Sequence, residues 1–436
     1  MPEKCVKSIA RRELFVKIWL LGLQLFIVLM LVVPTRFQLE RGAFLFLLAG
    51  ALLPFFTETW RIDRKILFLS ILALTISSIG LFVGVLNNNP GVFNVATIYF
   101  VWPVLYLFLI GFARGEDWVR RVFSAIFFGI GLCVCLATLV FLAGLFGFED
   151  KFFPLIDFLD PGFGKYDGFT EFRIVNFTTV MYGFPFLLSC FYVNYKNYSC
   201  TKRFVFILYL LLIIFLAIVS GRRGFLLIII MAPVVIVILS HVSGYYLSSK
   251  HFVLIAVLGI VSVPVLNVIL HGVFGVDIYV SAKNFLSAFS NSEVSSGLRY
   301  TQADALWERF SESPLYGVGF GATAEVIRSV SHPWSYELFY LSLLMNVGAV
   351  GFASYCAVIF VNIFYGLKIS RTDKKFAVYL IPSITALLCF LVVSGTNPYL
   401  TKFDYLWVVF LPSAIISSQK AGILNVRHCD CKLEFR

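Results

Sequence analysis

The sequence predicts an all-α polytopic membrane protein with about twelve transmembrane helices. Sixty per cent of the 436 residues are hydrophobic, and apolar runs of about 17 to 25 residues, the length that crosses a hydrocarbon core, recur along the whole chain. Backbone amides in lipid need partners within a helix or a closed barrel. Uninterrupted runs such as FVFILYLLLIIFLAIV favour helices, because the strands of a barrel alternate apolar and polar residues.

Hydropathy places the spans along a single integral-membrane domain that covers residues 1–436. The spans are expected near 14–33, 42–56, 66–86, 92–112, 122–146, 175–193, 204–219, 224–240, 252–270, 348–367, 376–394 and 403–417. The segment 335–347, directly before the tenth span, is expected to form a re-entrant or interfacial helix.

The distribution of lysine and arginine predicts the orientation of the chain. With the N-terminus inside, the inner segments carry 22 of these residues and the outer segments 12, and basic residues favour the cytoplasmic side of short loops. Both termini are therefore expected in the cytoplasm, with no cleavable signal peptide before the first span. The net charge of +11 suits contact with anionic membrane lipids, so nucleic acid is not expected as a partner.

Two long outer segments interrupt the pattern of short connections. The first, 147–174, is rich in Phe, Gly and Asp and is expected to form a folded cap, whose side chains suit either sugar contacts or interfacial packing. The second is a large outer loop, 271–347. Loops of this length are usually functional or disordered. All nine cysteines fall in predicted spans or inner segments, so no disulfide is expected on the outer side.

The large loop contains a predicted amphipathic helix, RYTQADALWERF (residues 299–310). One stripe of this helix carries Tyr300, Ala303, Leu306, Trp307 and Phe310. Such a stripe suits either the membrane surface or packing on neighbouring spans.

A glycine-rich segment, SPLYGVGFGA, follows the predicted helix. Pro314 discourages continuation of the helix, and Gly317, Gly319 and Gly321 permit tight turns or a close approach of two backbones. The alternative is that its backbone amides contact a phosphate or a sugar.

Two adjacent arginines, Arg222 and Arg223, lie at the outer membrane boundary, against the usual preference for the inner side. A planar guanidinium can pair with two phosphate oxygens at once, and the alternative is that both side chains snorkel to lipid headgroups. Charged residues within the spans are scarce, and no buried relay of the kind that proton-coupled carriers use is present in the sequence. Any chemistry is therefore expected at the outer surface.

Three outer features occur in a set order: SGRRG (220–224), an arginine fifteen residues before PLYGVGFG, and a helix that ends in GAVG (348–351). In this order the chain resembles the bacterial O-antigen polymerase and ligase superfamily, mainly over residues 218–367. Members are integral-membrane glycosyltransferases, of the GT-C type, that use undecaprenyl-diphosphate-linked glycans at the periplasmic face of the inner membrane. The resemblance implies that Arg222 or Arg223, together with Arg299, holds the diphosphate of the donor.

The chain departs from the ligase pattern at the position of the base. In ligase-type members a histidine precedes the first glycine of the GxxG ending by eleven residues, and this count leads from Gly348 to Glu337, while His332 lies five residues earlier. A carboxylate can accept the proton of an attacking hydroxyl, so the departure favours a polymerase. His332 is the alternative base, or it fixes a turn or binds acceptor sugar. Glu337 could instead pair with an arginine or occupy a helix N-terminus.

The resemblance implies a metal-independent, inverting polysaccharide polymerase that needs no cofactor. It would join undecaprenyl-diphosphate-linked oligosaccharide repeats into a surface polysaccharide, with membrane lipids and a chain-length regulator as further partners. One alternative is a ligase that transfers finished glycan to lipid A core. An alternative from another class is a lipid-linked sugar transporter or flippase, which would line a polar cavity between its spans.

Overall fold

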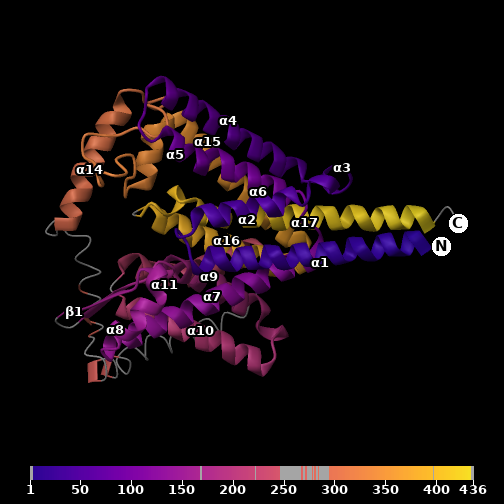
Figure 1. Cartoon of the computed structure of the whole chain (residues 1–436), viewed down its shortest axis with the longest axis horizontal. Coiled ribbons are helices and arrows are strands. Elements are labelled where there is room, and N and C mark those ends of the chain that lie inside the picture. Colours follow the sequence, from indigo (N-terminus) through magenta and orange to yellow (C-terminus); the bar gives the residue numbers. More distant parts are fainter. Residues whose placement is uncertain are drawn as a thin grey trace.

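The computed structural model describes residues 3–245, apart from 167, 168 and 221, and residues 294–433, apart from 396. Between these two ranges it describes only residues 267, 268, 271, 272, 277, 279, 280 and 283. Most of the long helices lie along one common axis, and the two chain termini project from the same end of the resulting bundle (Figure 1).

Helices make up most of the described structure, which also contains one short hairpin. The first half comprises α1 (Glu3–Val32), α2 (Gln38–Gly50), η1 (Leu53–Phe55), α3 (Phe56–Thr59), α4 (Arg64–Leu86), α5 (Val92–Ala96), η2 (Thr97–Val101), α6 (Trp102–Ile110), α7 (Gly115–Leu145), α8 (Glu149–Phe152), η3 (Phe153–Leu159), β1 (Gly162–Tyr166) and β2 (Phe169–Arg173). The second half comprises α9 (Phe177–Asn194), η4 (Tyr195–Asn197), α10 (Cys200–Val219), α11 (Arg223–Val242), α14 (Val294–Ser311), α15 (Phe339–Thr372), α16 (Lys374–Ser394), η6 (Tyr399–Thr401) and α17 (Phe403–Leu433).

Nine helical stretches in the described part of the chain are long and apolar enough to cross a membrane. The chain is therefore an all-α, multi-pass membrane protein. These stretches correspond to nine of the twelve predicted spans. Of the other three, residues 175–193 overlap α9 and residues 403–417 lie in α17, whereas residues 252–270 lie almost entirely outside the described part. The count of twelve stays a prediction.

Helices α9 and α16 form the centre of the bundle. Helix α16 packs on α9, α11, α15 and α17, and α9 is buried along nearly its whole length. A helix surrounded by other helices needs no polar face, which explains why both sequences are apolar all round. Close contact of α9 with α7 depends on a small residue, because a Cβ at Gly183 would lie 2.6 Å from the side chain of Ile130.

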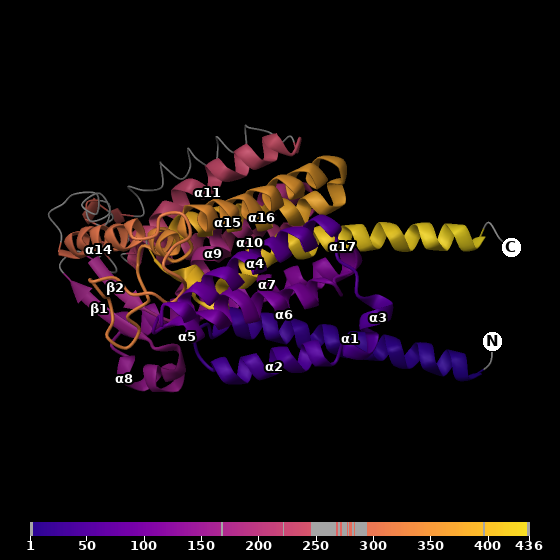
Figure 2. The ribbon, with the colours of Figure 1, turned by 90° about the horizontal axis from the view of Figure 1, so that it is seen from above.

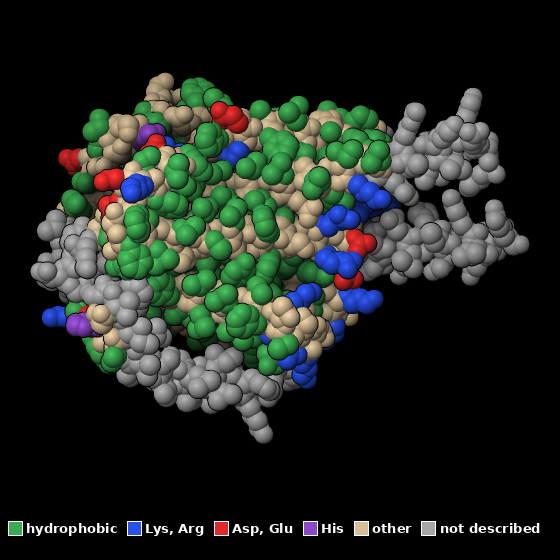
Figure 3. All heavy atoms as spheres, turned by 60° about the horizontal axis from the view of Figure 1, so that its bottom comes forward, with side chains coloured by type: hydrophobic (Ala, Val, Ile, Leu, Met, Phe, Trp, Pro, Cys, Tyr) green, Lys and Arg blue, Asp and Glu red, His purple; other side chains and the backbone are tan. Residues whose placement is uncertain are grey.

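Inter-helix connections meet at the end of the bundle from which the termini project. The backbone N–H of Asp63 donates to Ser417 Oγ (3.4 Å), and Gln419 Nε2 donates to Asp373 Oδ2 (3.2 Å). Lysine and arginine side chains gather at this end, beside the projecting terminal helices, while hydrophobic side chains cover the flank of the bundle (Figure 3). This arrangement is typical of a membrane protein whose basic loops share one side.

The opposite end of the bundle carries α8, the hairpin and α14 (Figures 1 and 2). Residues 147–174 fold into α8, η3 and the antiparallel β1–β2 hairpin, which pairs Gly162 with Arg173 and Tyr166 with Phe169. Arg173 Nη2 lies 3.1 Å from Asp160 Oδ1 and so ties the hairpin to the end of η3. This end of the bundle is called the α14 end below.

The glycine-rich segment at the α14 end threads between α4 and α15. Gly317, Gly319 and Gly321 all have positive φ angles, of 75°, 87° and 78°. A Cβ at Gly319 would lie 2.3 Å from the backbone nitrogen of Gly84, and one at Gly321 would lie 2.2 Å from that of Val92. Only glycine combines this conformation with such close approach of two backbones.

The backbone amides of this segment already have protein partners. Val318 N–H donates to Met345 O (3.0 Å), Gly319 N–H to Asn346 O (3.0 Å), and Phe320 N–H to Gly80 O (2.9 Å). Of the alternatives that the sequence left open, the structure therefore favours close packing over contact of these three amides with a phosphate or sugar. The glycines serve close packing instead.

Helix α15 is interrupted where the glycine-rich segment crosses it. Gly348 has φ 67° and ψ −179°, and a Cβ there would lie 2.3 Å from the carbonyl oxygen of Leu315. The freed N–H of Ala349 donates to Pro314 O (2.8 Å). Of the segment 335–347, residues 339–347 thus form the first part of α15, and the break sets their direction relative to the rest of that helix.

Candidate functional site

Helix α14 packs on the first part of α15 with a face that only partly matches the predicted stripe. Leu306 and Phe310 are buried as expected, but Tyr300 and Trp307 are 55% and 56% exposed. The buried face includes Gln302 instead. The predicted stripe spans a wide arc of the helix, and a single neighbouring helix covers only one side of that arc.

Packing of α14 on α15 brings Arg299 to Glu337. Arg299 Nε donates to Glu337 Oε2 at 2.8 Å. The second carboxylate oxygen, Oε1, lies 3.1 Å from Nη2 of a further arginine, Arg328. Side-chain exposure is 36% for Arg299, 48% for Arg328 and 22% for Glu337. The carboxylate is thus the least exposed member and is held between two guanidinium groups.

Local structure fixes the position of Glu337. Its backbone N–H donates to Oε1 of the buried Gln302 of α14 (3.1 Å), and its carbonyl oxygen accepts from Phe339 N–H (3.0 Å) at the start of α15. Of the two geometric alternatives raised by the sequence, the arginine pairing is present. Glu337 lies one residue before the N-cap Leu338 of α15, and no side-chain cap hydrogen bond is present there in the described structure. Neither ion pair removes Glu337 as a base, since each carboxylate oxygen has two acceptor sites.

Arg222 lies against the ring of Phe177 and is hydrogen-bonded to the Tyr399 hydroxyl. It precedes α11, and its guanidinium carbon is 5.0 Å from the ring centroid of Phe177. Burial raises the pKa of the Tyr399 hydroxyl. The positive charge of Arg222 and hydrogen bonds with Arg222 and Thr178 oppose this rise, whereas the negative charge of Glu337 adds to it. Tyr399 is therefore close enough to respond to both Arg222 and Glu337.

Lys402 extends the group of cations. The residue as a whole is exposed, but desolvation of its ammonium group by the surrounding protein lowers the pKa of that group. The charge of Asp404 opposes this shift, and the charge of Arg328 adds to it. We use the term cationic cluster for Arg222, Arg299, Arg328 and Lys402. Glu337 contacts two of these residues, Arg299 and Arg328, and the Tyr399 hydroxyl is hydrogen-bonded to a third, Arg222. Such a cluster suits an anionic ligand, because guanidinium and ammonium groups are the common partners of phosphate.

The two other residues predicted for the site are Arg223 and His332. Arg223 is the first residue of α11 and is half-buried. His332 is exposed, with Nδ1 3.0 Å from Ser331 Oγ and its ring edge-on to Trp334 at 5.8 Å. Among the described residues, no hydrogen bond or ion pair joins His332 to Glu337. The structure therefore brings Arg299 to Glu337 but leaves His332 on a neighbouring part of the loop.

Sequence reasoning missed Arg328 and Tyr399. Arg328 lies in the segment 322–338, which has no helix or strand and hence no periodicity that could predict its neighbours. Tyr399 lies in η6, far along the chain from Arg222. The sequence signal for Arg328 was a cation in a loop that is predicted to be an outer one, where basic residues are less frequent.

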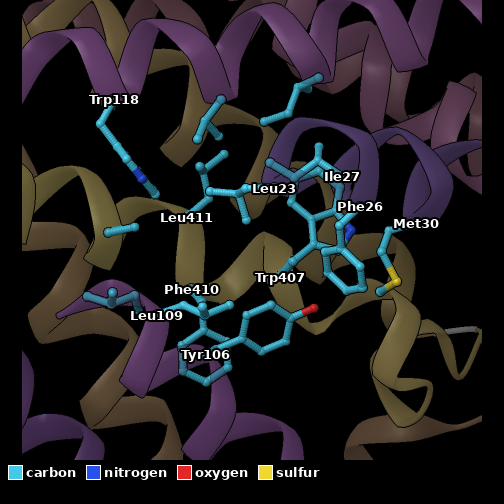
Figure 4. A pocket seen from close by; sticks show the side chains of 14 residues that line it. Leu23, Phe26, Ile27, Met30, Tyr106, Leu109, Trp118, Trp407, Phe410 and Leu411 are labelled. Carbon is cyan, nitrogen blue, oxygen red and sulfur yellow. The ribbon is translucent and has the colours of Figure 1, made fainter. Parts of the chain in front are cut away.

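A separate cavity of about 90 Å³ lies within the bundle between α1, α6, α7 and α17 (Figure 4). None of its lining residues is charged, and none belongs to the cationic cluster. The hydroxyl of Tyr106 and the indole N–H of Trp118, both from the lining, have no hydrogen-bond partner in the described structure. The cavity is suited to apolar contents and holds no group for acid–base chemistry near neutral pH.

The chemistry that the charged site can perform follows from its composition. A carboxylate can accept a proton, and arginines can stabilise charge that develops on a phosphate oxygen. In the described part of the chain, no three His, Cys, Asp or Glu side chains lie together as a metal site would require. No family model matches the chain, and no curated protein matches it.

Proposed function

We propose that the chain is an inverting glycosyltransferase that polymerises lipid-linked oligosaccharide repeats into a surface polysaccharide. The observation that carries this proposal is Glu337 held between Arg299 and Arg328, with Arg222 and Tyr399 nearby, at one end of a membrane-spanning bundle. A base beside several arginines is what the transfer of a sugar from a diphosphate requires. The site would lie at the periplasmic face of the bacterial inner membrane, with both termini in the cytoplasm.

The proposed reaction uses Glu337 as the base. The hydroxyl oxygen of the acceptor sugar forms a bond to the anomeric carbon of the donor, and the hydroxyl proton passes to the Glu337 carboxylate. The bond between that carbon and the diphosphate oxygen breaks, and its electron pair stays on the phosphate. Inversion follows when the attacking oxygen and the leaving diphosphate lie on opposite faces of the sugar.

Arginines would stabilise the leaving group. The donor diphosphate gains negative charge as the bond breaks, and Arg222 and Arg299 can share that charge through charge-assisted hydrogen bonds. Arg223, which follows Arg222 at the start of α11, is the second candidate from that turn. The donor would be the growing chain on undecaprenyl diphosphate, and the acceptor the next lipid-linked repeat.

The second candidate function is a ligase that transfers finished glycan to lipid A core. Both enzymes would use the same donor diphosphate, and the carboxylate in place of the histidine of ligase-type members favours the polymerase. A transporter or flippase gains no support from the cavity of Figure 4, because its lining offers no polar path.

A comparison of surface glycans tests the proposal. A strain that lacks the protein is compared with the complemented strain on a gel probed for lipid A core that carries sugar. Core bearing a single repeat, with long chains absent, supports the polymerase. Core without any repeat, with lipid-linked chains accumulating, supports the ligase instead. Unchanged long chains would exclude both.

A further inference from the structure

The two arginines on Glu337 differ in how firmly they are held. Arg299 projects from α14, a helix that packs on α15. Arg328 projects from the segment 322–338, which has no helix or strand, and its side chain is the more exposed of the two. Exposed ion pairs are screened by solvent and contribute little. The pair between Arg328 and Glu337 is therefore the easier one to break.

The charge balance of the site shows what could break that pair. At the carboxylate itself, Arg299 and Arg328 contribute two positive charges and Glu337 one negative charge, which leaves an excess of one positive charge. A diphosphate that is esterified at both ends carries two negative charges. Its oxygens suit the planar fork of arginine as well as a carboxylate does. An entering diphosphate would thus compete with Glu337 for the nearest arginine.

We propose that Arg328 is a further diphosphate-binding residue, and that it leaves Glu337 for the diphosphate when the donor binds. This inference rests on the proposed function for the identity of the ligand. Glu337 then keeps its contact with Arg299 through Oε2, while Oε1 becomes free to accept the proton of the acceptor hydroxyl. Departure of Arg328 thereby adds a free acceptor site on Oε1 in the loaded site.

Binding of inorganic pyrophosphate to the purified full chain in lipid nanodiscs tests the exchange by calorimetry. Four proteins are compared: wild type, Glu337→Gln, Arg328→Gln and the double variant. Removing the competing carboxylate is expected to tighten pyrophosphate binding about twofold to fivefold, a range set by the modest strength of half-exposed ion pairs. Arg328→Gln is expected to weaken binding, and in that background Glu337→Gln should give no gain.

The double variant separates partner exchange from simple charge repulsion. If Glu337 only repels the anion, its removal tightens binding by the same factor with or without Arg328, and that result would overturn the inference. Equal affinity of Glu337→Gln and wild type would overturn it as well. Glu337→Asp, in which the carboxylate is drawn back from Arg328, provides a second variant, and it is expected to tighten binding in part.

Glu312→Gln is the matched control. Glu312 pairs with Arg309 near the end of α14, and its side chain is 51% exposed, so its loss should leave pyrophosphate affinity unchanged. The binding cycle needs no glycan transfer. The two experiments can therefore give different results. If the binding cycle succeeds and the gel experiment fails, the site binds anions with partner exchange but the protein is no polymerase. If the gel experiment succeeds and the binding cycle fails, the proposed function stands and the partner exchange is overturned.

Discussion

Nε of Arg299 lies 2.8 Å from Oε2 of Glu337, although 38 positions separate the two residues in the chain. The pair forms because α14 packs on α15, and because Gln302, three positions after Arg299, accepts the backbone N–H of Glu337. One helix therefore supplies both the ion-pair partner of the carboxylate and the group that holds its backbone. This dependence makes the pair sensitive to changes in the packing of α14.

Replacement of Arg299 should separate the roles of charge and shape. Lysine keeps the positive charge but loses the planar fork, whereas alanine loses both. We expect glycan transfer to fall about tenfold in Arg299→Lys and about a hundredfold in Arg299→Ala, in line with the loss of charge-assisted hydrogen bonds. Transfer is measured in membrane vesicles supplied with lipid-linked repeats. Wild-type rates in both variants would exclude a role in holding the diphosphate.

Replacement of Glu337 by glutamine tests the proposed base. The amide keeps the size of the side chain but cannot accept the hydroxyl proton, so transfer is expected to fall by about 10² to 10⁴, the usual contribution of a general base. Folding and membrane insertion should be intact, as checked by detergent extraction and size-exclusion chromatography. Glu312→Gln, directly after the end of α14, serves as the control. Glycans of normal length in Glu337→Gln would remove this residue from the mechanism.

A buried ion pair links α2 to the start of α17. Arg41 and Asp404 form a salt bridge whose side chains are 3% and 0% exposed. Loss of one partner leaves an uncompensated buried charge, so Arg41→Met is expected to lower the free energy of unfolding by about 3 to 5 kcal/mol. In the double variant Arg41→Met, Asp404→Leu, most of that loss should be recovered.

Thermal unfolding of these two variants in detergent gives the comparison. A double variant that is as unstable as Arg41→Met would show that the destabilisation comes from packing and not from the unpaired charge. Activity is measured in parallel, because α17 follows directly after Lys402 of the cationic cluster.

Gly319→Ala should be strongly destabilising. The φ angle of 87° costs a residue with a Cβ about 1 to 2 kcal/mol, and the Cβ would lie 2.3 Å from the backbone of Gly84, which cannot move easily. Gly42→Ala in α2 is the control, because a Cβ there meets nothing within 4 Å, and a helical alanine is favoured. Equal thermal stability of the two variants would contradict the observed path of the glycine-rich segment.

Hydropathy predicted the helices well because the requirement in lipid is local. Every span must satisfy its own backbone and present apolar side chains along about 20 residues, so a run such as 204–219 predicts α10 with no knowledge of its neighbours. The stripe 299–310 was predicted less well. Tyr300 and Trp307 are exposed, because the direction from which α15 covers α14 is a property of the tertiary structure.

The residues of the candidate site were likewise predicted only in part from the sequence. Family resemblance singled out Arg299 and Glu337, which the structure joins directly. Arg328 was not predicted, because an irregular segment has no periodicity from which a neighbour can be inferred. His332, proposed as an alternative base, contacts Ser331 and Trp334 instead, because five residues of loop are enough to carry a side chain away from a fixed carboxylate.

The sequence by itself determined that this is a multi-pass helical membrane protein, since this follows from local chemistry. For the glycine-rich segment it left tight turns, close backbone approach and ligand contact open. Only the tertiary structure decided that the amides of Val318, Gly319 and Phe320 bind protein carbonyls, and that two arginines share the carboxylate of Glu337. The physical reason is that these contacts join segments whose relative placement depends on the packing of whole helices.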